Sequence, residues 1–173
     1  IAYGFDGTFD GDGHTISGIY HTENGNNAEG KYNALFGCID KNGVVKNIVF
    51  SENNHITSYN YVGSIASLNM GTIENCSNYA DITATNFDAG GICGFMVNGN
   101  GTVKDCHNYG NVTAMTYASG ICGGSQSGKS ITTYSYLIEG CTNSGNLSTS
   151  NGLGSAGIAG SYSGAIRNCT NSG

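Results

Sequence analysis

The sequence predicts an all-β protein, a right-handed parallel β-helix of about five to six coils, each of about 28 to 30 residues. The main observation is a phrase that occurs four times, in which an aliphatic residue, a cysteine and an asparagine recur: Ile73-Glu-Asn-Cys76-Ser-Asn78, Val103 to Asn108, Ile138 to Asn143 and Ile166 to Asn171. With a degenerate copy at Ile48, the anchor positions 48, 76, 106, 141 and 169 lie 28, 30, 35 and 28 residues apart. Such a period is typical of a solenoid of stacked coils.

Composition points the same way. The 173 residues include 29 glycines and no proline, and only 10% of them are charged. An average domain is about 25% charged, so this composition favours tightly turning sheets over helices. The simplest prediction is one elongated domain over residues 1–173, with an N-terminal coil at 1–41 and repeated coils at 42–173.

One coil, from Gly71 to Gly94, is expected to contain three short strands and three turns. Residues 71–73 open the first strand, and residues 81–85 alternate inward Ile82 and Ala84 with outward threonines. This period of two is typical of a strand. Residues 89–94, rich in small side chains, are expected to form the third side.

The other coils fill the same inward positions with aliphatic residues. Three columns are expected in the core: Val45, Ile73, Val103, Ile138 and Ile166; Ile56, Ile82, Val112 and Leu147; Ile65, Ile92, Ile121 and Ile158. Each strand then pairs with its equivalent in the next coil, which makes the sheets parallel, and the usual crossover preference predicts right-handed winding.

Two further columns are expected to be structural ladders, one of cysteines (Cys76, Cys106, Cys141, Cys169) and one of asparagines (Asn78, Asn108, Asn143, Asn171). We interpret the cysteines as buried thiols, although stacked coils would also permit disulfides sterically. Asparagines at a bend can bond the backbone and one another through their amides. A ligand site of four asparagines is the alternative.

An outward column alternates in sign: Lys46, Glu74, Lys104, Glu139 and Arg167. Opposite charges across adjacent strands stabilise a sheet and like charges repel. We interpret the column as a device that sets the register of the coils.

Several classes of function are disfavoured. The net charge is −6, and the six basic residues are scattered, so there is no basic patch for nucleic acid. No apolar run approaches the roughly 20 residues that cross a bilayer, so no membrane insertion is expected. The chain begins at Ile1 and stops within a repeat phrase, from which we expect a fragment that continues beyond both ends.

The segment Gly4-Phe-Asp-Gly-Thr-Phe-Asp-Gly-Asp-Gly-His-Thr-Ile-Ser-Gly-Ile19 resembles the one that precedes the repeats of bacterial surface proteins with GLUG motifs. Asn33-Ala-Leu-Phe-Gly37 and Gly43-Val-Val-Lys-Asn-Ile48 are similar to the phrase that follows it in that family. The Gly-Ile-Cys-Gly coils resemble variants found beside IgA-protease-like peptidases of Firmicutes. The resemblance implies a secreted or cell-surface repeat region and transfers no catalytic residue.

Catalysis is not expected, because lyases of acidic sugars need clustered basic residues and hydrolases need paired carboxylates on one face. Asp6, Asp10 and Asp12 are weak candidates for a metal site, but Asp-Gly pairs usually indicate turns and the EF-hand ligand series is absent. No metal and no cofactor is predicted.

Aromatic residues are the better candidates for ligand binding. Tyr61, Phe87 and Tyr117 each stand four or five residues before the inward isoleucine of their coil, where they could bind a sugar ring or simply stack on one another. Solenoid insertions often lie on the binding face, and the longest coil adds residues 125–136. Its candidates are Lys129, Tyr134 and Tyr136.

The function expected is a non-catalytic, extracellular structural or adhesive repeat module, an adhesin-like part of a large bacterial surface protein. Its partners would be neighbouring repeats, host or cell-wall glycans, or surface proteins. One alternative is a carbohydrate-binding or carbohydrate-processing β-helix. Another is a filament subunit that associates end to end through an uncapped strand edge.

Overall fold

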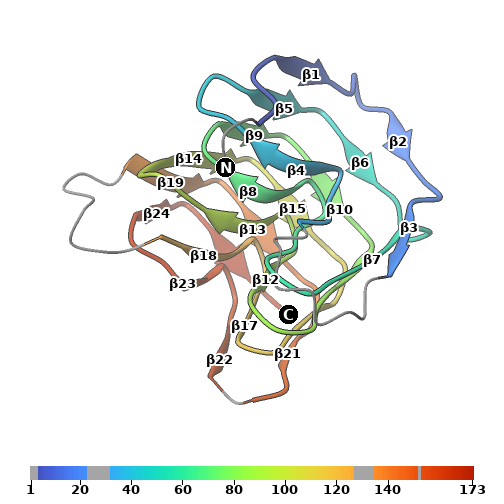
Figure 1. Ribbon diagram of the computed structural model, residues 1–173, viewed down its shortest axis with the longest axis vertical. Helices are drawn as coiled ribbons and strands as arrows, with labels where there is room; N and C mark the ends of the chain where they lie inside the picture. Colours follow the sequence, from blue (N-terminus) through green and yellow to red (C-terminus); the bar gives the residue numbers. More distant parts are fainter. Residues whose placement is uncertain (1–3, 23–31, 127–134, 152) are drawn as a thin grey trace.

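The computed structural model describes residues 4–22, 32–126, 135–151 and 153–173, which form short strands and turns without any helix. The strands belong to five parallel sheets, here numbered I to V in the order in which the chain first visits them in a full coil (Figure 1). Sheet I contains β1 (Thr8–Asp10), β5 (Val44–Lys46), β9 (Thr72–Glu74), β14 (Asn100–Lys104), β19 (Ser135–Glu139) and β24 (Ala165–Arg167). Sheet II contains β2 (Thr15–Ile16), β6 (Val49–Phe50), β10 (Ser77–Asn78), β15 (His107–Asn108), β20 (Thr142–Asn143) and β25 (Thr170–Asn171).

The remaining sheets complete each coil. Sheet III contains β3 (Tyr20–Thr22), β7 (His55–Ser58), β11 (Asp81–Ala84), β16 (Val112–Ala114) and β21 (Leu147–Thr149). Sheet IV contains β12 (Ala89–Gly90), β17 (Tyr117–Ser119) and β22 (Gly154–Ala156). Sheet V contains β4 (Phe36–Ile39), β8 (Ala66–Asn69), β13 (Cys93–Met96), β18 (Cys122–Ser125) and β23 (Ala159–Ser161).

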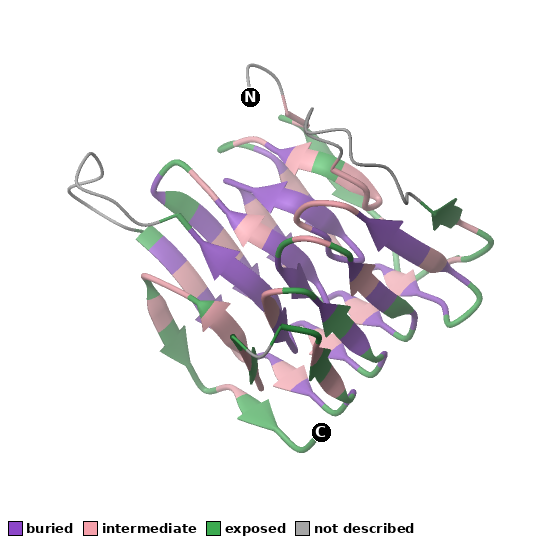
Figure 2. Ribbon diagram, turned by 60° about the horizontal axis from the view of Figure 1, so that its bottom comes forward, coloured by how far each residue is buried: buried purple, intermediate pink, exposed green. Residues whose placement is uncertain are grey.

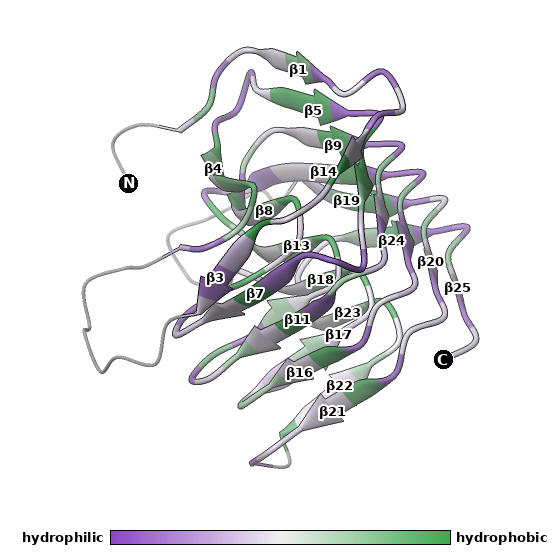
Figure 3. Cartoon of the chain, turned by 90° about the vertical axis from the view of Figure 1, so that its right-hand side faces the viewer, coloured by the Kyte–Doolittle hydropathy of each residue, from purple (hydrophilic) through white to green (hydrophobic). Residues whose placement is uncertain are grey.

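Each strand pairs with its counterpart in the next coil, so that the coils stack in chain order (Figure 3). In sheet I, for example, Val45 lies beside Ile73 and Ile73 beside Val103. Sheets I and II each have six strands, one per coil. The predicted parallel β-helix is therefore confirmed.

The coil is more finely divided than the three strands expected from the sequence. Sheet I ends and sheet II begins at residues with left-handed backbone, such as Asn47 (φ 58°), Asn75 (φ 51°) and Asp105 (φ 49°). Asparagine and aspartate tolerate this conformation better than other side chains do. Likewise, the single strand expected at residues 89–94 is broken into β12 and β13. The prediction of three strands per coil was wrong because it took no account of these bends.

The three predicted aliphatic columns lie in the interior. Ile73, Ile82 and Ile92 are fully buried, and each belongs to a different column. Burial is most complete in the middle coils and decreases towards the last one, where Ile166 is exposed (Figure 2). The core is thus a continuous stack along the solenoid.

The four asparagines form the predicted amide ladder. The Nδ2 group of Asn78 donates to Oδ1 of Asn108, Asn108 to Asn143, and Asn143 to Asn171, each at 2.7 Å. Each Nδ2 group also donates to a backbone carbonyl two residues ahead, as Asn108 does to Gly110 at 2.8 Å. The amides are therefore engaged with one another, which supports the structural interpretation over a ligand site.

The cysteine column is also internal, and all seven cysteines of the chain are free thiols in the structure. The backbone N–H of Cys76 points to Sγ of Cys106 at 3.4 Å, and that of Cys106 to Sγ of Cys141 at 3.4 Å. Burial raises the pKa of the Cys106 thiol well above its usual range. These thiols pack as small apolar side chains.

The charge column holds as predicted and gains one member. Sheet register places Asp10 beside Lys46, Lys46 beside Glu74, and Glu74 beside Lys104, and the alternation continues through Glu139 and Arg167. The Nζ–carboxylate distances are 3.3 Å for Lys46 and Asp10 and 3.6 Å for Lys104 and Glu74. Asp10 is therefore part of the register device.

Candidate functional site

A hollow of about 610 Å³ lies where sheets IV and V meet. Strands β17 and β22 run at an angle to β18 and β23 (Figure 1). The residues that line the hollow come from both sides of this corner. Rings form much of its wall: Tyr32, Tyr61, Phe87, Phe95 and Tyr117. We call this hollow the corner groove. Its volume is in the usual range of small-molecule sites.

Two outward columns, one from each sheet, line the corner groove. On sheet IV, the register places Tyr61, Asp88 and Tyr117 at the same position of consecutive coils, since Val62 pairs with Ala89 and Ala89 with Ala118. On sheet V, the matching column contains Leu68, Phe95, Gly124 and Ser161. The side chains of a single coil could not form this site, because the residues that line it come from five consecutive coils.

The aromatic side chains of the corner groove stack on one another. The ring centroids of Tyr61 and Phe95 are 4.3 Å apart with planes inclined by 25°, and those of Tyr61 and Phe87 are 5.4 Å apart and inclined by 27°. Tyr61, Phe87 and Tyr117, selected from the sequence, are therefore brought to one groove. Their packing also matches the alternative interpretation as plain aromatic stacking.

Asp88 is the charged residue at the floor of the corner groove. Its side chain is only 7% exposed, and its Oδ1 accepts a hydrogen bond from the Thr116 hydroxyl. Burial raises the pKa of the Asp88 carboxyl, although hydrogen bonds from Thr116 and from the backbone N–H of Tyr117 work in the opposite direction. Next to it, Gly124 leaves space: a Cβ there would lie 2.8 Å from the Phe95 ring and 3.2 Å from Oδ2 of Asp88.

The walls of the corner groove carry no basic side chain among the described residues that line it. Leu68, Met70 and Val97 add aliphatic surface, and Asn98, Ser125 and Gln126 add polar groups. The groove therefore presents one buried negative charge surrounded by aromatic and apolar surface.

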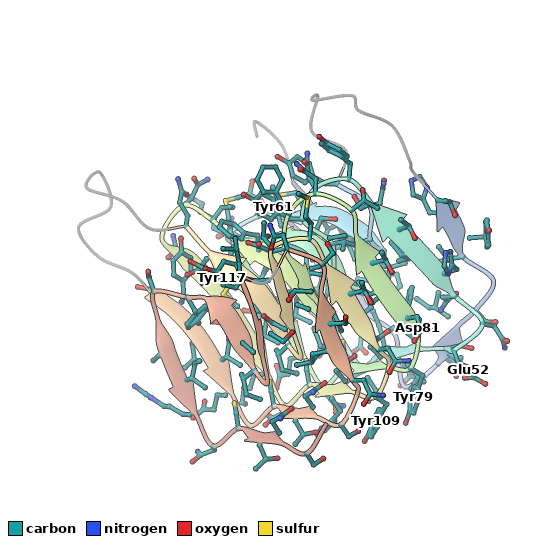
Figure 4. All side chains as sticks on the ribbon, turned by 90° about the horizontal axis from the view of Figure 1, so that it is seen from below. Glu52, Tyr61, Tyr79, Asp81, Tyr109 and Tyr117 are labelled. Atoms are coloured by element: carbon teal, nitrogen blue, oxygen red, sulfur yellow. The ribbon has the colours of Figure 1, made fainter. Side chains whose placement is uncertain are left out.

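A second aromatic surface lies at the opposite corner of the coil, between sheets II and III (Figure 4). Tyr79 and Tyr109 stack with centroids 4.6 Å apart and planes within 10°, and they are 42% and 46% exposed. An adjoining hollow of about 420 Å³ is lined by polar and aromatic side chains: Tyr20, Glu52, Asn53, Asn54, His55, Tyr79 and Asp81. We call this surface the tyrosine face.

The other residues selected from the sequence have different outcomes. Lys129 and Tyr134 lie outside the described residues. Tyr136 is only 2% exposed, and its hydroxyl accepts a hydrogen bond from the backbone N–H of Gly99 at 2.8 Å. Its expected role in ligand binding is therefore corrected: Tyr136, on β19 and paired with Gly101 in the sheet, packs its ring in the core.

The candidate metal ligands Asp6, Asp10 and Asp12 do not converge. Oδ2 of Asp6 accepts from the Asn42 amide at 3.3 Å, whereas Asp10 accepts from the Asn47 amide at 2.8 Å, which lowers the pKa of Asp10. Asp12 has the left-handed backbone of a turn, with φ 49°. The described residues contain no cluster of three His, Cys, Asp or Glu side chains that would suit a metal ion.

Asp88 and Phe95 were not recognised as site residues from the sequence. A stricter alignment could have found Asp88: it stands four residues before Ile92, as Tyr61 stands before Ile65 and Tyr117 before Ile121. Because the sequence analysis accepted a spacing of either four or five residues before the inward isoleucine, it selected Phe87 instead of Asp88. Phe95 offered no such signal, since its approach to Tyr61 depends on the angle between sheets IV and V.

Comparison with known proteins gives a partial sequence match and a match in fold. No protein-family model matches the chain. Over 90 residues, 52% of this chain, it is 37% identical to halomucin of Haloquadratum walsbyi, of which the match covers 1%.

The described residues form no helix long and apolar enough to cross a membrane.

Among solved structures, the chain is similar to a protein of Bacteroides ovatus named "putative immunoglobulin A1 protease". The TM-score is 0.63 at 19% identity, and the match covers 93% of this chain and 58% of the other. The chain thus corresponds to little more than half of that structure and to a very small part of halomucin. At this level of identity the structural match shows a shared fold, a parallel β-helix.

Proposed function

We propose that the chain is a non-catalytic repeat module of a secreted or cell-surface protein, in which it serves as a stiff structural segment. The observation that carries this proposal is the set of uninterrupted ladders through the coils. Asn108, for example, is bonded to Asn78 on one side and to Asn143 on the other. Such ladders bond the side chains of each coil to those of the next coil, and contacts between neighbouring repeats are what stabilise a solenoid.

The small number of charged side chains available for catalysis supports the same proposal. Six of the chain's 18 charged residues (6 + 12), Asp10 included, belong to the charge column. Glycosidases typically need two carboxylates about 5 to 10 Å apart on either side of the substrate. Among the described residues that line the corner groove, Asp88 alone has a carboxylate.

The comparisons support an extracellular location. The partial sequence match is to a protein named halomucin, and the similar fold belongs to a protein named as a putative immunoglobulin A1 protease. The resemblance of residues 4–19 to segments of GLUG-containing surface proteins agrees with this placement. We therefore propose that this module belongs to the repeat regions of such surface proteins.

Antibodies raised against the chain test the proposal in the organism that produces it. We expect labelling of intact cells, or of the culture medium, at the level seen after permeabilisation. Labelling that appears only in permeabilised cells would contradict an extracellular module. Reducing-sugar release from a panel of polysaccharides by the purified chain would contradict the non-catalytic part.

A second candidate function, carbohydrate binding, is favoured by the tyrosine face. Exposed tyrosine rings beside amide and carboxylate groups are suited to sugars, because rings pack on the apolar face of a sugar and polar groups bond its hydroxyls. A glycan array would test it with Tyr79→Ala and Tyr109→Ala, and with Phe87→Ala in the corner groove as the control. Sugar binding that the two tyrosine variants leave intact would remove this candidate.

A further inference from the structure

The Asp88 carboxylate in the corner groove has hydrogen-bond donors but no basic partner among the described residues. The Thr116 hydroxyl and the Tyr117 N–H donate to it, and both are neutral groups. A carboxylate that is 7% exposed has lost most of its hydration. Burying an ionised group is costly unless an opposite charge compensates. A ligand that places a positive charge beside Asp88 would therefore be bound more tightly than a neutral ligand of the same shape.

The rings around Asp88 are placed to attract the same kind of charge. Tyr61 and Tyr117 occupy the position of Asp88 one coil before and one coil after it, each about 4.8 Å away along the stack at the backbone. Phe95, from sheet V, stacks on Tyr61 with ring centroids 4.3 Å apart. The faces of aromatic rings carry partial negative charge and attract cations, most strongly where water is excluded.

The aliphatic part of the remaining wall favours a cation that needs few hydrogen bonds, although Asn98, Ser125 and Gln126 add polar groups elsewhere in the groove. Leu68, Met70 and Val97 present aliphatic surface, which cannot accept an N–H from a primary ammonium group. A methylated ammonium group has no N–H to satisfy, and its methyl groups pack on apolar and aromatic surface. Anionic ligands would be repelled by Asp88, since no described lining residue is basic.

We propose that the corner groove binds a quaternary ammonium group, with Asp88 as its counter-ion and with the outer surface of the stacked Tyr61–Phe95 pair and the ring of Tyr117 against its methyl groups. The lack of a side chain at Gly124 lets the Phe95 ring and the Asp88 carboxylate lie close to each other. The inference is independent of the scaffold role and of the tyrosine face, because it uses different residues.

The test compares two ligands of equal shape, choline and its neutral analogue 3,3-dimethyl-1-butanol, titrated into the full chain and followed by NMR chemical shifts. We expect saturable choline binding that is at least about tenfold tighter than that of the neutral analogue, as a desolvated cation–π and ion-pair site requires. Equal affinities would overturn the proposal, and so would the absence of saturable choline binding.

Variants separate the contributions of charge and rings. Asp88→Asn keeps the size of the side chain and should weaken choline binding about tenfold, while it leaves the weak binding of the neutral analogue unchanged. Tyr117→Leu keeps apolar volume and should also weaken choline selectively. Tyr79→Ala, on the tyrosine face, is the control and should have no effect. Full choline affinity in Asp88→Asn, or displacement of choline by a neutral sugar, would contradict the assignment.

Discussion

The side-chain amide of Asn108 donates to Oδ1 of Asn143, one coil further on, at 2.7 Å, and both side chains are almost completely buried. This contact is one step of the amide ladder, and it joins coils whose residues lie 35 positions apart in the sequence. Neighbouring coils are thereby joined through side chains as well as through the backbone. The consequences for stability can be measured.

Asn108→Ala should lower the free energy of unfolding by about 3 kcal/mol. The substitution removes three hydrogen bonds in the interior, those of Asn108 with the Asn78 amide, with Oδ1 of Asn143 and with the Gly110 carbonyl. Each such bond contributes roughly 0.5–1.5 kcal/mol to stability. Asn171→Ala is the matched control, because it lies at the exposed end of the ladder and should cost far less. Urea denaturation measures both, and equal losses would contradict a cooperative buried ladder.

Gly120→Ala should destabilise the fold by about 3 kcal/mol, the upper part of the range for overpacking. A Cβ at Gly120 would collide with the Asn143 side chain and with the backbone carbonyl of Gly157, which cannot move without disturbing the next coil. Gly37→Ala is the control, since its Cβ would meet nothing closer than the Tyr32 carbonyl oxygen at 3.4 Å. Thermal unfolding of the two variants checks the prediction, and similar melting temperatures would contradict it.

Lys104→Glu should destabilise the stack most strongly at low ionic strength. The new carboxylate would lie between Glu74 and Glu139 in the charge column, where Lys104 now sits 3.6 Å from Glu74. The neighbouring carboxylates of Glu74 and Asp105 raise the pKa of Lys104, so the present environment favours a positive charge at this position. Because exposed charges are screened by salt, the loss should shrink in about 1 M NaCl, where the screening length is about 3 Å.

Lys41→Glu is the control for this charge reversal, as Lys41 lies outside the column. It changes the net charge equally, so a general charge effect would make the two variants alike. Equal unfolding midpoints for the two variants in low salt would argue against a register role for the charge column.

Asp88→Asn should stabilise the protein near neutral pH. The native pKa of Asp88 is raised by burial, so the native state binds a proton more tightly than the unfolded state does. Its contribution to stability is therefore complete below the unfolded pKa, about 3.9, and is lost as the pH rises through the higher native value. Asparagine does not titrate, so the advantage of the variant should grow over this interval and then level off.

Unfolding free energies of the wild type and Asp88→Asn at a series of pH values check this prediction. A difference that does not change with pH would mean that the carboxyl has the same pKa in both states. Because the variant is expected to be at least as stable at neutral pH, a loss of choline binding by Asp88→Asn would not be due to unfolding.

The sequence alone determined the architecture, because a side chain that recurs once per coil must stack on its own copies. This recurrence identified the inward columns, the Asn108 ladder and the charges around Lys104. Their sequence spacing carries the information directly, since parallel register joins equivalent positions. It also brought Tyr61 and Tyr117 into the set of candidate ligand-binding residues.

Only the tertiary structure decided what depends on the angles between sheets. Left-handed residues such as Asn75 separate sheet I from sheet II, and the corner between sheets IV and V brings Phe95 towards Tyr61 and buries Asp88. The same geometry places Tyr136 in the core. A repeat period specifies which residues stack but contains no information on how sharply the chain turns between them, and the corner groove exists only because of those turns.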